Sequence, residues 1–326
     1  MLECLHCGNI VYKFANRCKN CGEVLYPIVN TISQFNLNKK ITMGEGNTPM
    51  FQSDNLKSQI GCKSLYIKNE TTNPTGSFKD RGSIKEVIFA KRMGYKSIVA
   101  ASTGNMGISL AAYSAYVGLK CDIFAPQNTS RDKLGMMQVY GAKIHLVSCG
   151  YNGCLINAES YSKISDKNKI FLAGDYHLRM IGMLSLGYEM KDYNPDVIIC
   201  PVGNGNLLYS LYLANKMLGK KVQLIGVQIK GYETIRDNLI YEVDNINTVC
   251  PAVEVELPLQ GLGVIKALKE TNGYIVTVDN KEALKAQNMI AKNGLYLEPS
   301  GALSYAGGLK LNLENKKVIC VATGRN

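Results

Sequence analysis

The chain alternates short apolar runs with longer stretches in which apolar residues recur at helical spacing. A short continuous apolar run is typical of a strand buried on both faces, whereas helical spacing is typical of a helix with one buried face. The pattern predicts strands at 64–68, 97–101, 121–125, 143–147, 197–200, 223–227, 275–278 and 318–322.

Helical spacing between these strands predicts helices at 78–93, 105–117, 130–140, 153–164, 206–218, 280–293 and 300–312. Ser130, Asp279 and Ser300 stand where a side chain can cap a helix start. Strands that alternate with helices indicate parallel sheets covered by helices, so we expect an α/β fold. Ligands bind beyond the carboxyl ends of such strands, and the loops there are the first candidates for function.

Length and composition indicate a globular protein. The 326 residues suffice for one large or two medium domains, and 46% of them are apolar. We expect no membrane span and no secretory signal, and therefore a cytoplasmic protein, because no long apolar run and no basic start followed by an apolar segment occur. Polar residues 30–40 are expected to be a linker. The net charge of +11 comes from dispersed lysines, which favours a solvated surface and no nucleic-acid partner.

Two Cys-x-x-Cys pairs, each followed by glycine, lie near the N-terminus. They consist of Cys4, Cys7, Cys18 and Cys21. Four thiolates from two such turns suit tetrahedral zinc, which predicts a structural zinc ribbon over residues 1–29. A redox-active pair and a ribbon that has lost its metal are the alternatives. The remaining cysteines are scattered through apolar segments and are expected to be reduced.

One lysine follows a turn and stands at a predicted helix start. The turn is the segment 73–76, where proline and glycine prevent a helix, and we expect the helix to begin at Ser77 with Asp80 completing its cap. Lys79 then lies in the first turn, where free N–H groups and the helix dipole disfavour an ammonium ion. Its pKa is thereby lowered, as a nucleophile or base requires. The alternative is an ordinary solvated lysine.

Three further loops follow strands and carry groups that can bind anions. Ser102, Thr103 and Asn105 open the helix after the strand at 97–101, and Thr323 follows the last strand. The loop after 197–200 consists of Gly203, Asn204, Gly205 and Asn206 and also opens a helix. Its backbone N–H groups can bind a phosphate, although a tight structural turn is the alternative.

These segments together resemble the tryptophan-synthase-β-like (fold type II) pyridoxal phosphate enzymes, and among them the threonine synthases. The N-terminal ribbon is similar to that of some threonine synthases and cysteate synthases. The resemblance rests on GEGNTP at 44–49, NPTGSFKDRG at 73–82, STGN at 102–105, PVGNG at 201–205, EPSGA at 298–302 and ATG at 322–324.

The resemblance implies pyridoxal 5′-phosphate as cofactor. Lys79 would be its covalent anchor and then move protons as general base and acid. Phe78 and Asn105 would contact the ring and its phenolic oxygen, and Thr323 would face the pyridine nitrogen. A hydroxyl there does not enforce a protonated ring, which suits elimination and replacement chemistry. The phosphate would be held by Gly203, Asn204, Gly205 and Asn206, and the substrate carboxylate by Ser102 and Thr103.

The implied reaction converts O-phosphohomoserine and water to threonine and phosphate. Arg131, Lys133 and Arg179 are candidate partners of the substrate's phosphate or carboxylate. Segment 176–183 keeps only the arginine and glycine of the family's NPxRxEGQ. β-Replacement or elimination on O-phosphoserine, serine or a related amino acid is therefore the alternative, and a nucleic-acid-binding ribbon protein is the non-enzymatic one.

The resemblance also implies the domain division. A large cofactor-binding domain would comprise 30–85 and 148–326, and a small mobile domain would comprise 86–147. A homodimer is expected on the same grounds, with a small phosphorylated or hydroxylated amino acid as substrate.

Overall fold

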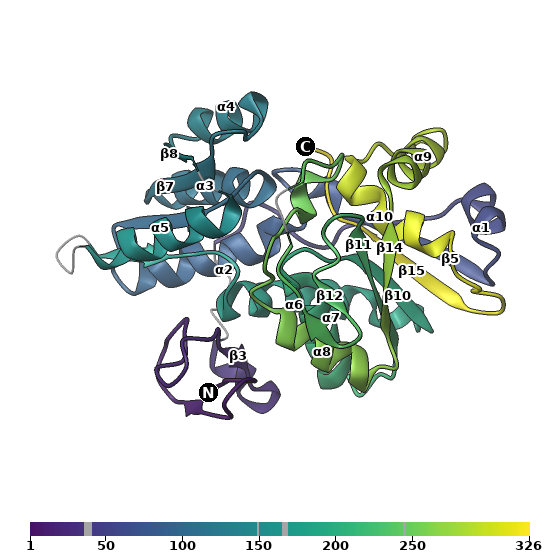
Figure 1. Cartoon of the computed structure of the whole chain (residues 1–326), viewed down its shortest axis with the longest axis horizontal. Coiled ribbons are helices and arrows are strands. Elements are labelled where there is room, and N and C mark those ends of the chain that lie inside the picture. Colours follow the sequence, from purple (N-terminus) through teal and green to yellow (C-terminus); the bar gives the residue numbers. More distant parts are fainter. Residues whose placement is uncertain (36–40, 149, 165–168, 244–245) are drawn as a thin grey trace.

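Two mainly parallel sheets with helices around them form the body of the molecule (Figure 1). The computed structural model describes residues 1–35, 41–148, 150–164, 169–243 and 246–326. The larger sheet is parallel except at β4, which is antiparallel to β5. Its order is β14 (Tyr274–Val278), β11 (Gln223–Ile229), β10 (Val197–Pro201), β15 (Lys317–Ala322), β5 (Ser64–Asn69) and β4 (Met50–Phe51).

The second sheet is parallel throughout. Its order is β8 (Lys143–Val147), β7 (Lys120–Pro126), β6 (Ser97–Ala101) and β9 (Ile170–Leu172). Every predicted strand is thus present, and the α/β class is confirmed. β9 lies outside the range 86–147 expected for the small domain, so this sheet draws on a longer part of the chain. The division into domains stays a prediction.

The helices cover both sheets. They are α1 (Asp54–Ile60), α2 (Lys79–Arg92), α3 (Asn105–Val117), α4 (Arg131–Val139), α5 (Tyr151–Lys163), α6 (His177–Met190), α7 (Asn206–Met217), α8 (Gly261–Glu270), α9 (Asn280–Ala291) and α10 (Pro299–Gly308). Short elements complete the body: η2 (Glu70–Thr72), η3 (Lys191–Tyr193), η4 (Pro251–Val253) and the hairpin of β12 (Ile235–Arg236) and β13 (Leu239–Ile240). The helices α1, α6 and α8 were not predicted from the sequence.

Of the four predicted helix caps, one is confirmed, one is confirmed in position only, and two are wrong. Asp279 forms a capping box with Glu282 at the start of α9. Ser130 occupies the N-cap position of α4, but its side chain makes no capping bond. Ser300 is the second residue of α10, which begins at Pro299 with Glu298 as its N-cap. The cap predicted for Ser77 fails because α2 begins at Lys79.

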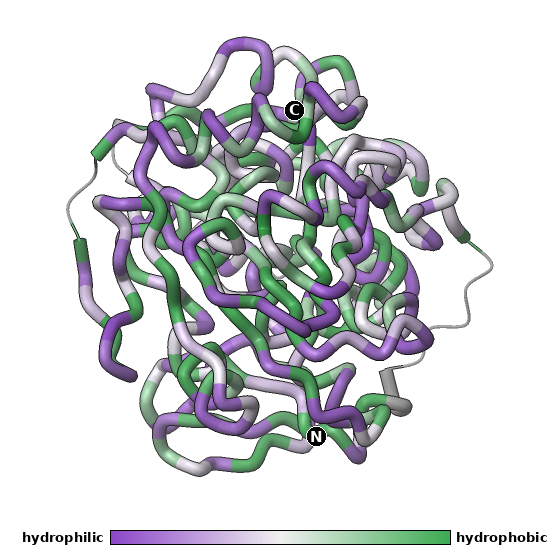
Figure 2. The backbone as a smooth tube through the Cα atoms, turned by 90° about the vertical axis from the view of Figure 1, so that its right-hand side faces the viewer, coloured by the Kyte–Doolittle hydropathy of each residue, from purple (hydrophilic) through white to green (hydrophobic). Residues whose placement is uncertain are grey.

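Helix α6 packs through the middle of the molecule, against α2 and α7. Gly182 lies directly against the backbone of Arg81 and Gly82, where any side chain would collide. This close approach brings the start of α6 beside Lys79. Figure 2 shows apolar backbone segments running through the interior, which matches the buried strands of both sheets.

The N-terminal ribbon is a separate three-stranded sheet in the order β2 (Ile10–Val11), β1 (Leu2–Glu3) and β3 (Tyr26–Pro27). It forms the purple lobe at the lower edge of Figure 1. The linker expected at 30–40 is wrong for its first half, because Val29–Phe35 forms a 3₁₀ helix (η1). Its second half, residues 36–40, lies outside the described residues.

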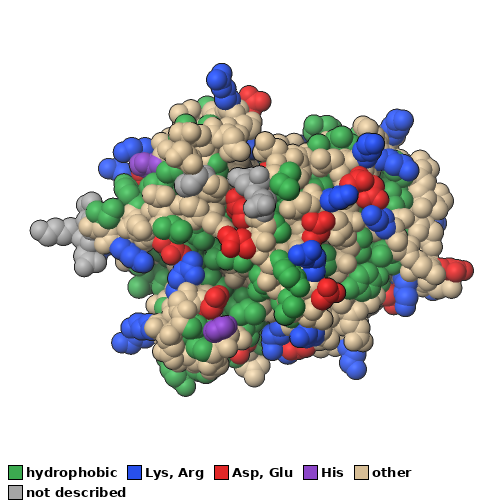
Figure 3. Space-filling model, in the orientation of Figure 1, with side chains coloured by type: hydrophobic (Ala, Val, Ile, Leu, Met, Phe, Trp, Pro, Cys, Tyr) green, Lys and Arg blue, Asp and Glu red, His purple; other side chains and the backbone are tan. Residues whose placement is uncertain are grey.

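The surface mixes charges of both signs. On the face in Figure 3, Lys and Arg side chains alternate with Asp and Glu. Among the described residues, none of the helices combines the length and the apolar character that a membrane span requires.

Candidate active site

Lys79 lies at the carboxyl end of the large sheet because the end of β15 holds the preceding loop. The Phe78 N–H donates to the carbonyl oxygen of Thr323 at 3.0 Å, and Ser77 pairs with Gly324 as an isolated bridge. The Asp80 carboxylate bonds back to the N–H and hydroxyl of Thr75 at 2.7 and 2.5 Å. The loop 73–78 is thereby closed, and Lys79 and Thr323 line the same cavity.

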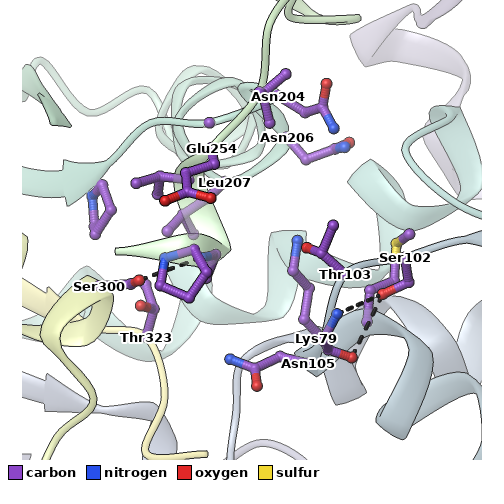
Figure 4. A pocket seen from close by; sticks show the side chains of 18 of the residues that line it. Lys79, Ser102, Thr103, Asn105, Asn204, Asn206, Leu207, Glu254, Ser300 and Thr323 are labelled. Carbon is purple, nitrogen blue, oxygen red and sulfur yellow. Dashed lines mark hydrogen bonds between the residues drawn. The ribbon is translucent and has the colours of Figure 1, made fainter. Parts of the chain in front are cut away.

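The Lys79 side chain points into this cavity, with Asn105 beside it and Thr323 and Ser300 opposite (Figure 4). Its Nζ lies 4.7 Å from the centre of the Phe78 ring. Removal of water lowers the pKa of Lys79; the charge of Asp175 opposes this effect. Lys79 is therefore not the solvated surface lysine of the alternative interpretation, and its environment favours the neutral amine.

The glycine-rich loop joins β10 to α7 and forms another wall of the cavity. Gly205 has φ +98°, and a Cβ there would lie 2.5 Å from Val264, so only glycine suits the position. The side-chain amides of Asn204 and Asn206 each donate to Asp175 at 2.6 Å. Backbone N–H groups at the start of α7 form the anion-binding end of the helix.

The loop after β6 places Ser102, Thr103 and Asn105 at the cavity, and the Ser102 side chain is also engaged with its own turn. The Ser102 hydroxyl accepts from the N–H groups of Gly104 and Gly107 at 3.2 and 2.8 Å. Asn105 donates to Glu298 at 2.6 Å, and its buried Oδ1 has no hydrogen-bond partner among the described residues. That oxygen is an open acceptor in the cavity wall.

Of the three candidate substrate cations, the structure brings only Lys133 to the cavity. Its Nζ lies 3.4 Å from Glu298. Arg131 is exposed at the start of α4 and does not line the cavity. Arg179 is fully buried beneath it, paired with Glu86 and donating to the carbonyl oxygen of Lys79 at 3.2 Å.

Comparison with known families decides how this cavity is interpreted. Residues 41–324 match the model of the family described as pyridoxal-phosphate dependent enzyme. The chain belongs to this family.

Similar members of the family share most of the chain. A threonine synthase of Methanocaldococcus jannaschii is 31% identical over 310 residues, covering 88% of this chain and 76% of that protein. A threonine synthase of Halalkalibacterium halodurans is 34% identical over 301 residues, covering 87% of this chain and 83% of that protein.

Solved structures confirm the fold type II architecture. Maize serine racemase superposes with a TM-score of 0.79 at 20% identity, covering 91% of this chain and 93% of that one. Threonine deaminase isoform 2 of Solanum lycopersicum superposes with a TM-score of 0.74 at 22% identity, covering 86% of this chain and 84% of that one. At these identities the likeness concerns the fold alone.

The residues present fit the cofactor for which the family is named. The cavity combines a desolvated lysine, a helix start with glycines for a phosphate, and a hydroxyl at a strand end. Buried acceptor oxygens of Asn105 and Asn206 lack partners among the described residues, as expected where a polar ligand supplies them. The roles of the individual residues stay predictions.

Sequence reasoning missed the acidic wall of the cavity. Asp175, Glu254 and Glu298 all line it. Glu298 stands in the EPSGA segment that carried the resemblance, so the motif itself was a usable signal. Asp175 directly precedes the divergent segment 176–183, and Glu254 follows a short 3₁₀ helix, so no motif marked either of them.

The four cysteines of the ribbon come together as expected. Their sulfur atoms all lie within 4.8 Å of one another, on two turns closed by N–H groups of Gly8 and Gly22. Four thiols at such distances suit a tetrahedral metal ion.

Proposed function

We propose that this protein is a pyridoxal-phosphate-dependent lyase that converts O-phosphohomoserine and water to threonine and phosphate. The observation that carries the proposal is the similarity to threonine synthases at 31–34% identity over nearly nine-tenths of the chain. The cavity supports it, since Lys79, the loop of Gly203–Asn206 and Thr323 surround one space.

Pyridoxal phosphate, when bound, supplies an electron sink for negative charge at the substrate carbon that bears the amine. The chain's own part is to hold that group and to move protons. Lys79 would anchor it and, since desolvation lowers the pKa of this amine, would take the α-proton and return protons later. The N–H groups at the start of α7 would hold the phosphate, and the Thr323 hydroxyl would face the ring nitrogen.

On the substrate side, Lys133 is the cation available at the described cavity wall besides Lys79. It comes from α4 and meets Glu298 at the start of α10, so it reaches across the cavity between the two sheets. Burial raises the pKa of Glu298, which eases its protonation when an anionic substrate draws Lys133 away. We therefore assign Lys133 to the substrate's phosphate and Thr103 to its carboxylate.

The acidic wall favours a second candidate function. Asp175, Glu254 and Glu298 outnumber the two lysines around the cavity, and carboxylates oppose a second phosphate beside that of the cofactor. Elimination or β-replacement on a hydroxylated amino acid such as serine would carry less charge into this site.

A substrate panel separates the two functions. Purified protein loaded with pyridoxal phosphate is offered O-phosphohomoserine, O-phosphoserine with sulfite or sulfide, serine and threonine, and threonine, phosphate and keto acids are quantified. Turnover of O-phosphohomoserine to threonine supports the first function. Turnover of O-phosphoserine, serine or threonine alone would replace it with the second.

For the ribbon we propose a structural zinc ion held by Cys4, Cys7, Cys18 and Cys21. The clustering of their sulfur atoms supports this. Metal analysis of freshly purified protein should give one zinc per chain, and no metal with all four thiols reduced would contradict it. A homodimer, expected from the family resemblance, is tested by the mass in solution.

A further inference from the structure

The ribbon contacts elements of both sheets. The Phe14 ring lies 4.6 Å from the ring of Phe89 on α2 and 4.9 Å from that of His177 at the start of α6. On the other side of the ribbon, the Tyr26 ring meets Tyr209 on α7 at 5.0 Å. The ribbon therefore packs against α2 and α7, whose N-terminal ends line the cavity, and against α6, which begins two residues after Asp175 of the cavity wall.

Arg17 links one cysteine turn to the body of the protein. It directly precedes Cys18, and its Nη1 donates to the Gly22 carbonyl oxygen at 3.0 Å. Its Nε and Nη2 contact one oxygen of Glu159, on α5, at 2.7 and 2.6 Å. The Tyr176 hydroxyl donates to the same oxygen at 2.7 Å. Glu159 is thus held from one side by the ribbon and from the other by a tyrosine that is 2% exposed.

Tyr176 is the covalent neighbour of Asp175, the acid of the cavity wall. The Asp175 carboxylate, 4% exposed, accepts from Asn204 and Asn206 and from the Tyr151 hydroxyl at 3.1 Å. A displacement of the Tyr176 ring would shift the Asp175 backbone and the side chains of the phosphate-binding loop with it. Contacts therefore run without a break from a cysteine turn to the loop at the start of α7.

The small core of the ribbon leads us to expect that its order depends on the proposed metal. Its strands span two residues each, and its buried apolar cluster consists of Leu2, Cys4, Cys18 and Leu25. Two of these four residues are proposed ligands. So small a core cannot stabilise a fold alone, and in such modules metal binding supplies the folding free energy.

We propose that the metal-loaded ribbon positions the acidic wall of the cofactor cavity through Arg17, Glu159 and Tyr176, so that cofactor affinity follows the metal content of the ribbon. In the described part of the chain, these three residues are not among those that line the cavity. They are therefore positioning residues. The inference rests on the proposed function only through its cofactor and does not depend on which amino acid is the substrate.

The test compares the affinity for pyridoxal phosphate, measured by the visible absorption of the lysine-bound cofactor, in zinc-loaded and chelator-stripped protein. Stripping should weaken binding at least about fivefold, the lower end of typical coupling between sites. In loaded protein Arg17→Ala should reproduce most of this loss, and Arg17→Lys should restore part of it. In stripped protein Arg17→Ala should add nothing. Lys19→Ala, an exposed basic residue on the other side of Cys18, is the matched control and should bind as wild type.

A second readout separates positioning from general loosening. Because the charge of Asp175 raises the pKa of Lys79, its displacement should move the pH midpoint of the visible band as well as the affinity. If Arg17→Ala does not fold, Tyr176→Phe removes one hydroxyl and serves the same comparison. Unchanged affinity after verified loss of zinc would overturn the inference. So would an undiminished Arg17→Ala effect in stripped protein, or an equal effect of Lys19→Ala. Since no substrate is used, a negative result leaves the substrate panel untouched.

Discussion

The replacement Asp175→Asn tests whether the acidic wall holds the cofactor loop. In the wild type both carboxylate oxygens are occupied: Oδ1 accepts from Asn206, and Oδ2 accepts from Asn204 and Tyr151. Asparagine has the same shape but offers one acceptor oxygen. The amide nitrogen of the new asparagine would face the side-chain N–H group of Asn204 or Asn206, so two donors would meet and one hydrogen bond would be lost.

The cost follows from the bond that is lost. A hydrogen bond to a charged group contributes about 1.5–3 kcal/mol, and a buried donor left unpaired costs a similar amount. If the whole of one such bond is expressed in cofactor binding, the dissociation constant of pyridoxal phosphate rises roughly 10- to 150-fold. The lost negative charge also lowers the pKa of Lys79 further, because Asp175 is the largest influence that raises it.

The assay is titration of the apoprotein with pyridoxal phosphate, followed by the visible band, with thermal unfolding as the check on the fold. Tyr151→Phe is the matched control, because it removes one neutral hydroxyl, which donates to Asp175 and accepts from Asn204 at 3.1 Å each, and leaves the carboxylate in place. It should cost only about 0.5–1.5 kcal/mol. Asp175→Asn with wild-type affinity and an intact fold would refute the role of the acidic wall.

Three further predictions follow from the same geometry. Lys79→Ala should abolish the visible band and reduce turnover about 10²- to 10⁴-fold, measured by absorption and by phosphate release. Gly205→Ala forces a Cβ to within 2.5 Å of Val264 at φ +98° and should destabilise the loop by roughly 1–3 kcal/mol, seen as weaker cofactor binding. Burial opposes ionisation of Glu189, but hydrogen bonds from Arg81 outweigh it and lower the pKa from 4.5 to about 2. Between pH 4.5 and about 2, Glu189 is protonated in the unfolded chain but still ionised in the folded protein. The free energy of unfolding therefore falls as the pH falls through this range, by about 3 kcal/mol at most. Glu189→Gln should flatten this part of the acid unfolding profile.

The sheets could be predicted from sequence because their strands are buried on both faces and appear as apolar runs. The residues of β6 and β10, for example, are all buried. Helix α6 could not be predicted in the same way, since nearly all of its circumference is buried and no polar face marks its period. The short strand β9 has three residues, too few for a pattern.

In the candidate site, features that depend on neighbouring residues could be predicted, and contacts between residues far apart in the chain could not. Loops at strand ends are local features, so Lys79, Asn105 and the glycine-rich loop could be predicted from neighbouring residues. Asp175 meets Asn204 and Asn206 across about thirty positions of chain, and Arg17 meets Glu159 across 142. Nothing in the local sequence records such pairs.

Arg179 shows why a motif residue does not carry its role with it. The resemblance places its charge at the substrate, yet in this chain the guanidinium is buried with Glu86 and bonded to the carbonyl oxygen of Lys79. A buried charge stays with the partner that compensates its lost hydration, because separating the pair would leave both ions unpaired in a dry interior. Arg179 therefore braces the turn that carries Lys79, which is why the proposal above assigns recognition of an anionic substrate to Lys133. Lys133 and its partner Glu298 both line the cavity, with Nζ 3.4 Å from the carboxylate, so an anionic substrate can compete for this lysine, whereas Arg179 is fully buried with Glu86 outside the cavity lining.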